Sequence, residues 1–345
     1  MDLQLGLDTF GDVTVGPDGT LLPHAQVVRD VVAQGRLADE VGVDAFGIGE
    51  HHRDDYAVSA PDVVLAGLAT TTERILLGSA VTVLSSDDPV RVMERFATID
   101  ALSGGRAEVT LGRGSFTESF PLFGFDLADY EVLFSEKLDL FARLRVATAQ
   151  GQPLTWEGST RRPLVEAQVW PRPEQQPLRS WVAVGGSPES VVRAARYGLP
   201  LMLAIIGGEP ARFAPYVDLY SRALDELGQP RLPVGVHSPG FVARTDAEAR
   251  ERLFPHFKVN RDRIGRERGW PPATRAQLDA EADHGALFVG SPETVARKIA
   301  ATVQALGIDR FDLKYSHGPL PHDHLMECIE LYGTQVAPMV RDLLA

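Results

Sequence analysis

Three adjacent polar residues form the densest group of potential catalytic side chains in the sequence. Glu50, His51 and His52 follow directly after a short apolar run that ends at Gly49. A histidine can accept and donate protons near neutral pH, and a neighbouring carboxylate can orient its ring. The alternative is a pair of histidines that only hydrogen-bond to the backbone, because adjacent side chains on a strand point to opposite faces. We take His51, with Glu50 beside it, as the candidate acid–base pair.

A second group has the composition of an anion-binding site. Arg113 stands between two glycines, so a ligand can approach its guanidinium group closely. Gly185, Gly186 and Ser187 precede a proline and a glutamate, a pattern that starts helices with the serine as N-cap. The free N–H groups of such a start, with the Ser190 hydroxyl one turn along, can hold a phosphate together with Arg113. The alternatives are a salt bridge for Arg113 and a simple capped turn for the glycines.

The same helix-start pattern occurs a second time, at residues 289–294. Either copy alone would be a helix cap more often than a phosphate site. The first copy has two glycines directly after an apolar run, which lets a ligand come close to the backbone. We therefore expect the first copy to be the binding one.

An apolar run over residues 203–206 ends at Ile206 and is followed by two glycines. A smooth wall of this kind suits contact with a flat ring, and ordinary barrel core followed by a turn is the alternative. We expect Ile206 to face a cofactor.

Eight short apolar runs alternate with helical patterns along the chain. Several are apolar throughout, as strands buried on both faces of a parallel sheet are. The strands are predicted at residues 3–7, 46–49, 76–83, 107–111, 181–184, 201–206, 234–242 and 311–315, and helices at 27–41, 89–102, 188–197 and 327–344. This alternation predicts an α/β fold, a (β/α)₈ TIM barrel. A doubly wound sheet is disfavoured because the first turn, residues 8–11, lacks a glycine-rich fingerprint.

Two segments are longer than a strand–helix connection needs, residues 115–178 and 244–310. We interpret them as rim insertions, with residues 244–285 covering the site, because long barrel segments are typically lids and substrate loops. The second insertion includes an arginine-rich stretch, residues 261–268. No low-complexity linker divides the chain, so we expect one domain over residues 1–345.

Composition excludes several classes of protein. The 345 residues carry 34 Lys and Arg against 47 Asp and Glu, a net charge of −13, which disfavours nucleic-acid binding. Cys328 is the sole cysteine, which excludes an intrachain disulfide framework or a cysteine-based metal site. We see no signal peptide and no apolar run of membrane-spanning length, so we expect a soluble, cytoplasmic protein with no membrane partner. A metal hydrolase is a weaker alternative, since the predicted strand ends do not supply converging ligands, and we expect no metal.

The ordered set of motifs resembles the bacterial luciferase-like flavin-dependent monooxygenases. The resemblance covers nearly the whole chain apart from the two insertions, and the order of the motifs is more specific than any one of them. In family order, the matching segments are Glu50-His51-His52, residues 78–84, 88–91, 102–106, Gly112-Arg113-Gly114, residues 121–124, 198–200 and 290–293.

That resemblance implies a barrel that uses reduced FMN, or the deazaflavin F420 in a sister branch. It implies that His51 is the active-site histidine. It also implies a bulge beneath the flavin ring, often with a cis peptide between non-proline residues, at Ala80 and Val81. The implied phosphate contacts are Arg113, Gly186, Ser187 and Ser190.

Two positions depart from the light-emitting members of the family. Those members have a reactive cysteine where this chain has Gly112, and an acidic residue where it has Gly186. Light emission is therefore not implied.

From these features we expect an FMN-dependent monooxygenase that receives reduced FMN from a separate flavin reductase and uses O₂. Apolar residues near the strand ends, Leu84, Phe116 and Ile205 among them, favour a small apolar organic substrate. The alternatives are an F420-dependent hydride-transfer oxidoreductase and a non-catalytic flavin-binding barrel. The resemblance also implies a homodimer.

Overall fold

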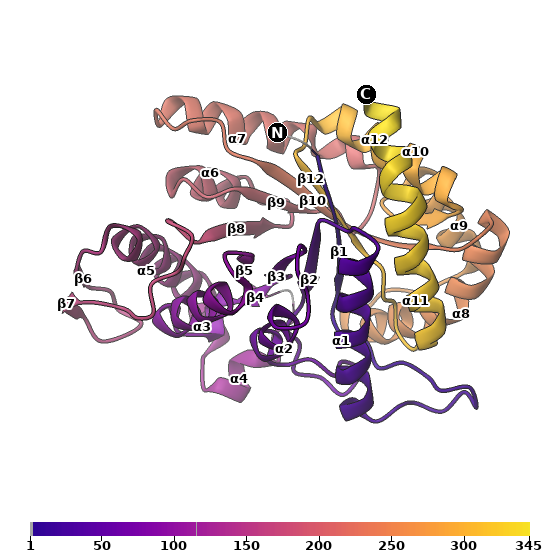
Figure 1. Cartoon of the computed structure of the whole chain (residues 1–345), viewed down its shortest axis with the longest axis horizontal. Coiled ribbons are helices and arrows are strands. Elements are labelled where there is room, and N and C mark those ends of the chain that lie inside the picture. Colours follow the sequence, from indigo (N-terminus) through magenta and orange to yellow (C-terminus); the bar gives the residue numbers. More distant parts are fainter. Residues whose placement is uncertain (1–2, 115) are drawn as a thin grey trace.

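Eight parallel strands form a closed barrel in the computed structural model, which describes residues 3–114 and 116–345. The barrel order is β1-β2-β3-β5-β8-β9-β10-β12, and β12 pairs again with β1. Helices surround the strands on the outside (Figure 1). The barrel strands are β1 (Gln4–Thr9), β2 (Ala45–Ile48), β3 (Leu76–Ser79), β5 (Ala107–Gly112), β8 (Arg179–Val184), β9 (Leu201–Ala204), β10 (Val234–Val242) and β12 (Arg310–Lys314). The predicted (β/α)₈ TIM barrel is confirmed.

Two short strands supplement the barrel. The run predicted as one strand over residues 76–83 is divided into β3 and β4 (Thr82–Val83), and β4 pairs with β5. A further strand, β11 (Phe288–Gly290), pairs with the carboxyl end of β10 outside the barrel. Both additions lie near the carboxyl ends of barrel strands, where the candidate site residues are.

The helices follow the predicted start and stop signals. Asp88 caps the start of α3 by accepting hydrogen bonds from the Val90 and Arg91 N–H groups, and Gly104 ends the helix with φ +66°. The C-terminal helix, predicted over residues 327–344 with an irregularity at Pro338, is α11 and α12 joined by a π-helical turn at Tyr332–Val336. The helices are α1 (His24–Glu40), α2 (Pro61–Ala69), α3 (Pro89–Ser103), α4 (Ser119–Phe123), α5 (Tyr130–Gln150), α6 (Pro188–Arg196), α7 (Ala214–Glu226), α8 (Asp246–Arg268), α9 (Arg275–His284), α10 (Pro292–Leu306), α11 (His322–Leu331) and α12 (Ala337–Leu344). None of them, within the described residues, is both long and apolar enough to cross a membrane.

An ion cluster fills the inside of the barrel below the candidate site. Arg310 on β12 bridges the carboxylates of Glu108 on β5 and Asp312 on its own strand, and all three side chains are buried. Burial raises the pKa of Asp312 to about 6, although the neighbouring guanidinium group opposes the shift. Glycines make room for the cluster, because a Cβ at Gly6 would lie 2.1 Å from Asp312 Oδ1 and one at Gly78 would lie 2.9 Å from Glu108 Cγ.

The two long segments have different positions. Residues 116–178 contain α4, α5 and a hairpin of β6 (Leu154–Trp156) and β7 (Leu164–Ala167), which projects from the barrel beside α5 (Figure 1). Trp156 Nε1 donates a hydrogen bond to Asp139 of α5 at 2.7 Å. The hairpin thus packs on a helix and not over the strand ends.

Residues 244–310 contain α8, α9, β11 and α10. That all of these belong to one domain remains a prediction.

A single carboxylate holds the connection between α2 and β3 at the amino end of the barrel. Asp39, near the end of α1, accepts hydrogen bonds from the Glu73, Arg74 and Ile75 N–H groups at 2.8, 3.0 and 2.8 Å. The side chain is buried, and although burial disfavours its charge, these donors lower its pKa.

We expect Asp39→Ala to lower the free energy of unfolding by about 2–3 kcal/mol, because backbone donors lose their acceptor in a place that water reaches poorly. Chemical denaturation measures the change. The matched control is Glu73→Ala, which removes an exposed side chain and keeps the same backbone hydrogen bond. Equal stability of the two variants would contradict this role for Asp39.

Candidate active site

One large cavity lies at the carboxyl ends of the barrel strands. Its volume is about 830 Å³, a size that suits a cofactor with a small substrate. Side chains of α8 form part of its wall. Of the predicted site residues, those lining the cavity are Glu50, His51, Ala80, Val81, Arg113, Gly185, Ser190 and Ile206. The remaining two, Gly186 and Ser187, lie beside the cavity at the start of α6 and are not part of its lining.

Three aromatic side chains surround His51, an environment that the sequence did not predict. Its ring stacks on Tyr56 with centroids 4.4 Å apart and contacts Phe10 at 4.8 Å and Phe116 at 5.0 Å. Its Nδ1 is 3.6 Å from Glu118 Oε1. Burial raises the pKa of Glu118, but the contact with His51, the residue's own backbone N–H group and the charge of Arg53 together outweigh it, so the net shift is downward. The carboxylate that faces the ring is therefore Glu118, at the start of α4.

Glu50 has a different role from the one predicted. Its Oε1 lies 2.9 Å from His52 Nε2, and its Oε2 accepts a hydrogen bond from the Val83 N–H group at 3.0 Å. The carboxylate thus connects the end of β2 to β4 and does not orient His51.

The segment between β3 and β4 forms the bulge that the family resemblance implies. The Ala80–Val81 peptide is cis, and both residues line the cavity. Glycines on the neighbouring strands accommodate them: a Cβ at Gly112 would lie 2.5 Å from Val81 Cγ2, and one at Gly47 would lie 3.0 Å from Ala80 Cβ. The absence of a side chain at Gly112 is therefore a packing requirement of this bulge.

One end of the cavity has the features of an anion site. Ser187 caps α6 by accepting a hydrogen bond from the Ser190 N–H group, and the Ser190 hydroxyl is buried without a hydrogen-bond partner among the described residues. Arg193 Nη1 is likewise buried without a partner. Arg113 lies at the same end, and the exposed Glu131 carboxylate ion-pairs with both arginines. The donors and cations at this end fit a phosphate group.

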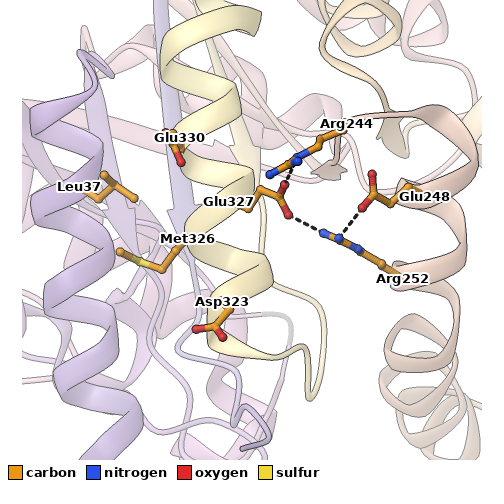
Figure 2. Close-up of a pocket in the computed structure, with 8 residues that line it drawn as sticks. All are labelled: Leu37, Arg244, Glu248, Arg252, Asp323, Met326, Glu327 and Glu330. Atoms are coloured by element: carbon orange, nitrogen blue, oxygen red, sulfur yellow. Dashed lines mark hydrogen bonds and ion pairs between the residues drawn. The ribbon is translucent and has the colours of Figure 1, made fainter. Parts of the chain in front are cut away.

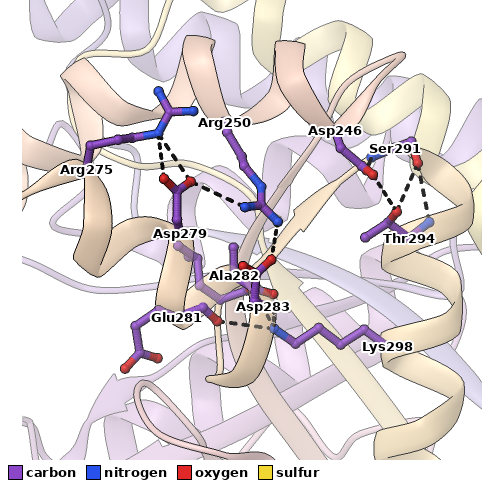
Figure 3. A network of polar contacts seen from close by, with 11 residues as sticks. Asp246, Arg250, Arg275, Asp279, Glu281, Ala282, Asp283, Ser291, Thr294 and Lys298 are labelled. Carbon is purple, nitrogen blue, oxygen red and sulfur yellow. Dashed lines mark hydrogen bonds and ion pairs between the residues drawn. The ribbon is translucent and has the colours of Figure 1, made fainter.

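The second copy of the helix-start motif is closed to ligands (Figure 3). Asp246 accepts hydrogen bonds from the Ser291 N–H group at 2.6 Å and from the Thr294 hydroxyl at 3.0 Å. These donors lower the pKa of Asp246 in spite of its partial burial. An internal carboxylate thus occupies the anion position at the start of α10, whereas the start of α6 borders the cavity.

Ile206 is 67% exposed although it is a large apolar residue, and it lines the cavity together with Gly207. The next glycine is held in place, because the Gly208 N–H group donates to Glu281 of α9 at 3.3 Å. An exposed aliphatic side chain facing a cavity fits the predicted contact with a flat ring. The contact itself remains a prediction.

A buried pair on the cavity wall was not predicted. Asp8 Oδ2, at the end of β1, lies 2.7 Å from His237 Nδ1 on β10. Burial disfavours the charged imidazole, but the carboxylate prevails and raises the pKa of His237. The ring also stacks parallel to Phe10, which contacts His51. The two residues are 229 positions apart in the sequence, so their pairing across the barrel depends on its closure. A sequence signal for the polar interior does exist, the alternation of charged and apolar residues over 310–314.

A second, outer groove lies between α1, α8 and α11 (Figure 2). Both of its arginines are engaged with carboxylates of the groove: Glu327 pairs with Arg244 and Arg252, and Arg252 also pairs with Glu248. Within the described residues, no three His, Cys, Asp or Glu side chains are arranged to hold a metal ion, in this groove or elsewhere. The cavity at the strand ends is therefore the candidate active site.

Curated relatives match large parts of this chain. The protein y4wF of Sinorhizobium fredii, described as uncharacterized, is 27% identical over 319 residues, which are 89% of each chain. The N-acetyl-S-alkylcysteine monooxygenase of Bacillus subtilis is 30% identical over 189 residues, 54% of this chain and 53% of its own length.

Solved structures share the fold over nearly the whole chain. The monooxygenase RslO1 from Streptomyces bottropensis aligns with a TM-score of 0.79 at 22% identity, covering 97% of this chain and 99% of its own. The oxygenating constituent of 3,6-diketocamphane monooxygenase from Pseudomonas putida, solved with FMN, aligns at 0.75 and 20%, with coverage of 98% and 99%. An F420-dependent secondary alcohol dehydrogenase aligns at 0.74 and 18%, with coverage of 99% and 100%.

The family model described as luciferase-like monooxygenase matches residues 9–310. This span includes the end of β1, the bulge, the anion end of the cavity and the whole of α8. The chain belongs to the luciferase-like monooxygenase family.

Proposed function

We propose that this chain is a monooxygenase that binds reduced FMN and uses O₂ to oxygenate a small organic substrate in the cavity. The observation that carries the proposal is the anion end of that cavity. There the guanidinium group of Arg113 and the start of α6 converge with the buried Ser190 hydroxyl, which has no hydrogen-bond partner within the described part of the chain. Family membership supports a flavin as the group that these donors hold.

The residues present fit FMN. Arg113, Ser190 and the α6 start would hold its phosphate, displacing the Glu131 carboxylate that now pairs with Arg113. Ala80, Val81 and Ile206 would support the two faces of its ring. When bound and reduced, the flavin supplies the electrons that activate O₂.

The chain's own contribution is to position protons and to exclude water. His51 faces the cavity between aromatic rings, with Glu118 beside its Nδ1, which leaves Nε2 to donate or accept a proton at the substrate. Phe257, Ile264 and Trp270 form part of the wall from the side of α8. Apolar groups around the reacting atoms keep water out of the cavity. This limits side reactions with water during a reaction that uses O₂.

We further propose that a separate reductase supplies the reduced FMN, because the first turn of the chain lacks the glycine fingerprint of a dinucleotide-binding unit. A homodimer, which the family resemblance implies, belongs to the same proposal. Light scattering measures the oligomeric state directly.

F420-dependent hydride transfer is the second candidate function. The F420-dependent alcohol dehydrogenase is about as similar in fold as the FMN-bound monooxygenase, and the same anion end would accept either cofactor's phosphate. A non-catalytic barrel is less favoured, because His51 and Arg113 both line the cavity. Equilibrium binding of FMN and of F420 separates the two active alternatives.

The oxygenase proposal predicts that the protein slows the oxidation of reduced FMN by air. Reduced FMN is mixed with excess protein without oxygen, air-saturated buffer is added, and the return of the oxidised flavin's absorbance is followed. We expect a rate several-fold below that of free flavin, because the cavity limits access of water. Oxidation at the rate of free flavin, or tight binding of F420 without binding of FMN, would contradict the oxygenase proposal.

The two ends of the cavity predict opposite kinetic effects. We expect His51→Ala to reduce turnover by about 100-fold or more while leaving FMN affinity within a few-fold, because the histidine moves protons. Arg113→Ala should weaken FMN binding by about 10- to 100-fold, because it removes a charge-assisted contact. Fluorescence titration and steady-state rates give the two quantities. Similar losses of affinity in both variants would show that the roles are not divided in this way.

The bulge predicts a third effect. Gly112→Ala places a methyl group against Val81, and we expect weaker FMN binding together with a loss of about 1–3 kcal/mol in stability. The matched control is Gly67→Ala on α2, where an added Cβ meets nothing within 4 Å. Unchanged FMN binding in Gly112→Ala would separate the bulge from the cofactor site.

A further inference from the structure

Four arginines cluster at the C-terminal end of α8, and the proposed function so far leaves them without a role. Arg263 is engaged with the loop after β2, through ion pairs with Asp54 and, at 3.1 Å, Asp55. Arg268 lies over the rings of Phe116 and Trp270. Arg266 is exposed and outside the cavity lining. Arg261 is the remaining member of the cluster and, like Arg268, it lines the cavity.

Arg261 forms no ion pair with any side chain among residues 3–114 and 116–345. Its guanidinium group lies 3.9 Å from the centroid of the Trp270 ring, which holds it on the cavity wall. Its Nη1 is buried and has no hydrogen-bond partner. A buried donor without an acceptor costs free energy, so the arrangement is most favourable when something else supplies the acceptor.

Two carboxylates, Glu281 and Asp262, act electrostatically on Arg261, and each accepts hydrogen bonds from other groups. Glu281 Oε2 accepts hydrogen bonds from the Gly208 and Ala286 N–H groups, at 3.3 and 3.2 Å. Asp262 accepts from Lys258 and from the Ala273 N–H group, both at 2.6 Å. A ligand in the cavity can supply the acceptor that Arg261 lacks among the described residues.

This cation is separate from the anion end at Arg113. Arg113 follows β5 and lies near the start of α6, whereas α8 passes over the loop after β12, where a Cβ at Gly318 would lie 3.2 Å from Asn260 Cβ. Asn260, one residue before Arg261, also lines the cavity and offers an amide donor. A phosphate held at the Arg113 end leaves Arg261 available to a second ligand.

We propose that the substrate of this cavity is an amphiphilic acid whose carboxylate binds Arg261. The inference rests on the proposed function. It narrows the substrate class from a small organic molecule to one that carries a carboxylate. The guanidinium fork matches a planar carboxylate, and the negative charges of Glu281 and Asp262 nearby disfavour a dianion such as phosphate. The apolar body of the acid would contact the neighbouring Phe257 and Ile264 side chains on the same wall.

Binding of sodium octanoate and of 1-octanol to the full-length chain tests the proposal. Both probes are titrated calorimetrically, with oxidised FMN present and again without it. We expect the chain to bind octanoate at least about tenfold more tightly than octanol, and Arg261→Gln to abolish that preference while octanol affinity is retained. Arg261→Lys, which keeps the charge and loses the fork, should give an intermediate preference. Arg266→Gln, the same change on the exposed side of α8, should leave both affinities unchanged.

No preference for octanoate in the wild-type chain would overturn the proposal. So would an Arg261→Gln variant that binds octanoate normally, or one that loses FMN affinity alone, which would assign the arginine to the flavin. A thermal melt of each variant shows whether the chain is folded. Retained octanol affinity shows that the apolar part of the cavity is intact. Because FMN binding is measured separately, a failure of the flavin proposal remains distinguishable from a failure of this one.

Discussion

The structure depends on a cluster of charges that the barrel encloses. Arg310 is held between Glu108 and Asp312, and breaking such a buried pair typically costs about 3–5 kcal/mol because an uncompensated charge remains. Gly6 and Gly78 provide the space, since a side chain at either would collide with a carboxylate. The interior below the site is thus filled by ionic groups, and the cavity begins above them.

Closure of the barrel around this cluster brings the chemical groups together. Every barrel strand is parallel, so all their carboxyl ends lie at one rim. His51, after β2, and Arg113, after β5, consequently face the same cavity although 62 residues separate them, as their numbers show. The bulge between them has room because Gly112 carries no side chain. The histidine, the bulge and the hydrogen-bond donors at the start of α6 therefore lie around one cavity.

Helix α8, whose side chains form part of the cavity wall, is attached at both of its ends. At its start, Asp246 connects the helix to the beginning of α10 (Figure 3). Near its end, Arg53 forms hydrogen bonds to both carboxylate oxygens of Glu267 at 2.8 Å, and Arg263 pairs with the loop after β2. Exposed ion pairs contribute only about 0.2–1 kcal/mol each. Burial of Leu253 in the hydrophobic core therefore contributes substantially to the packing of α8 on the barrel.

The sequence by itself determined the alternation of strands and helices, their approximate ends and the position of most site residues, because periodicity and capping residues are local properties. Only the tertiary structure decided which groups meet. Glu118 replaced Glu50 as the partner of His51, Asp8 paired with His237 across the barrel, and Asp246 closed the second helix start. These contacts join residues far apart in the chain, so no local pattern specifies them, and they exist only once the barrel has closed.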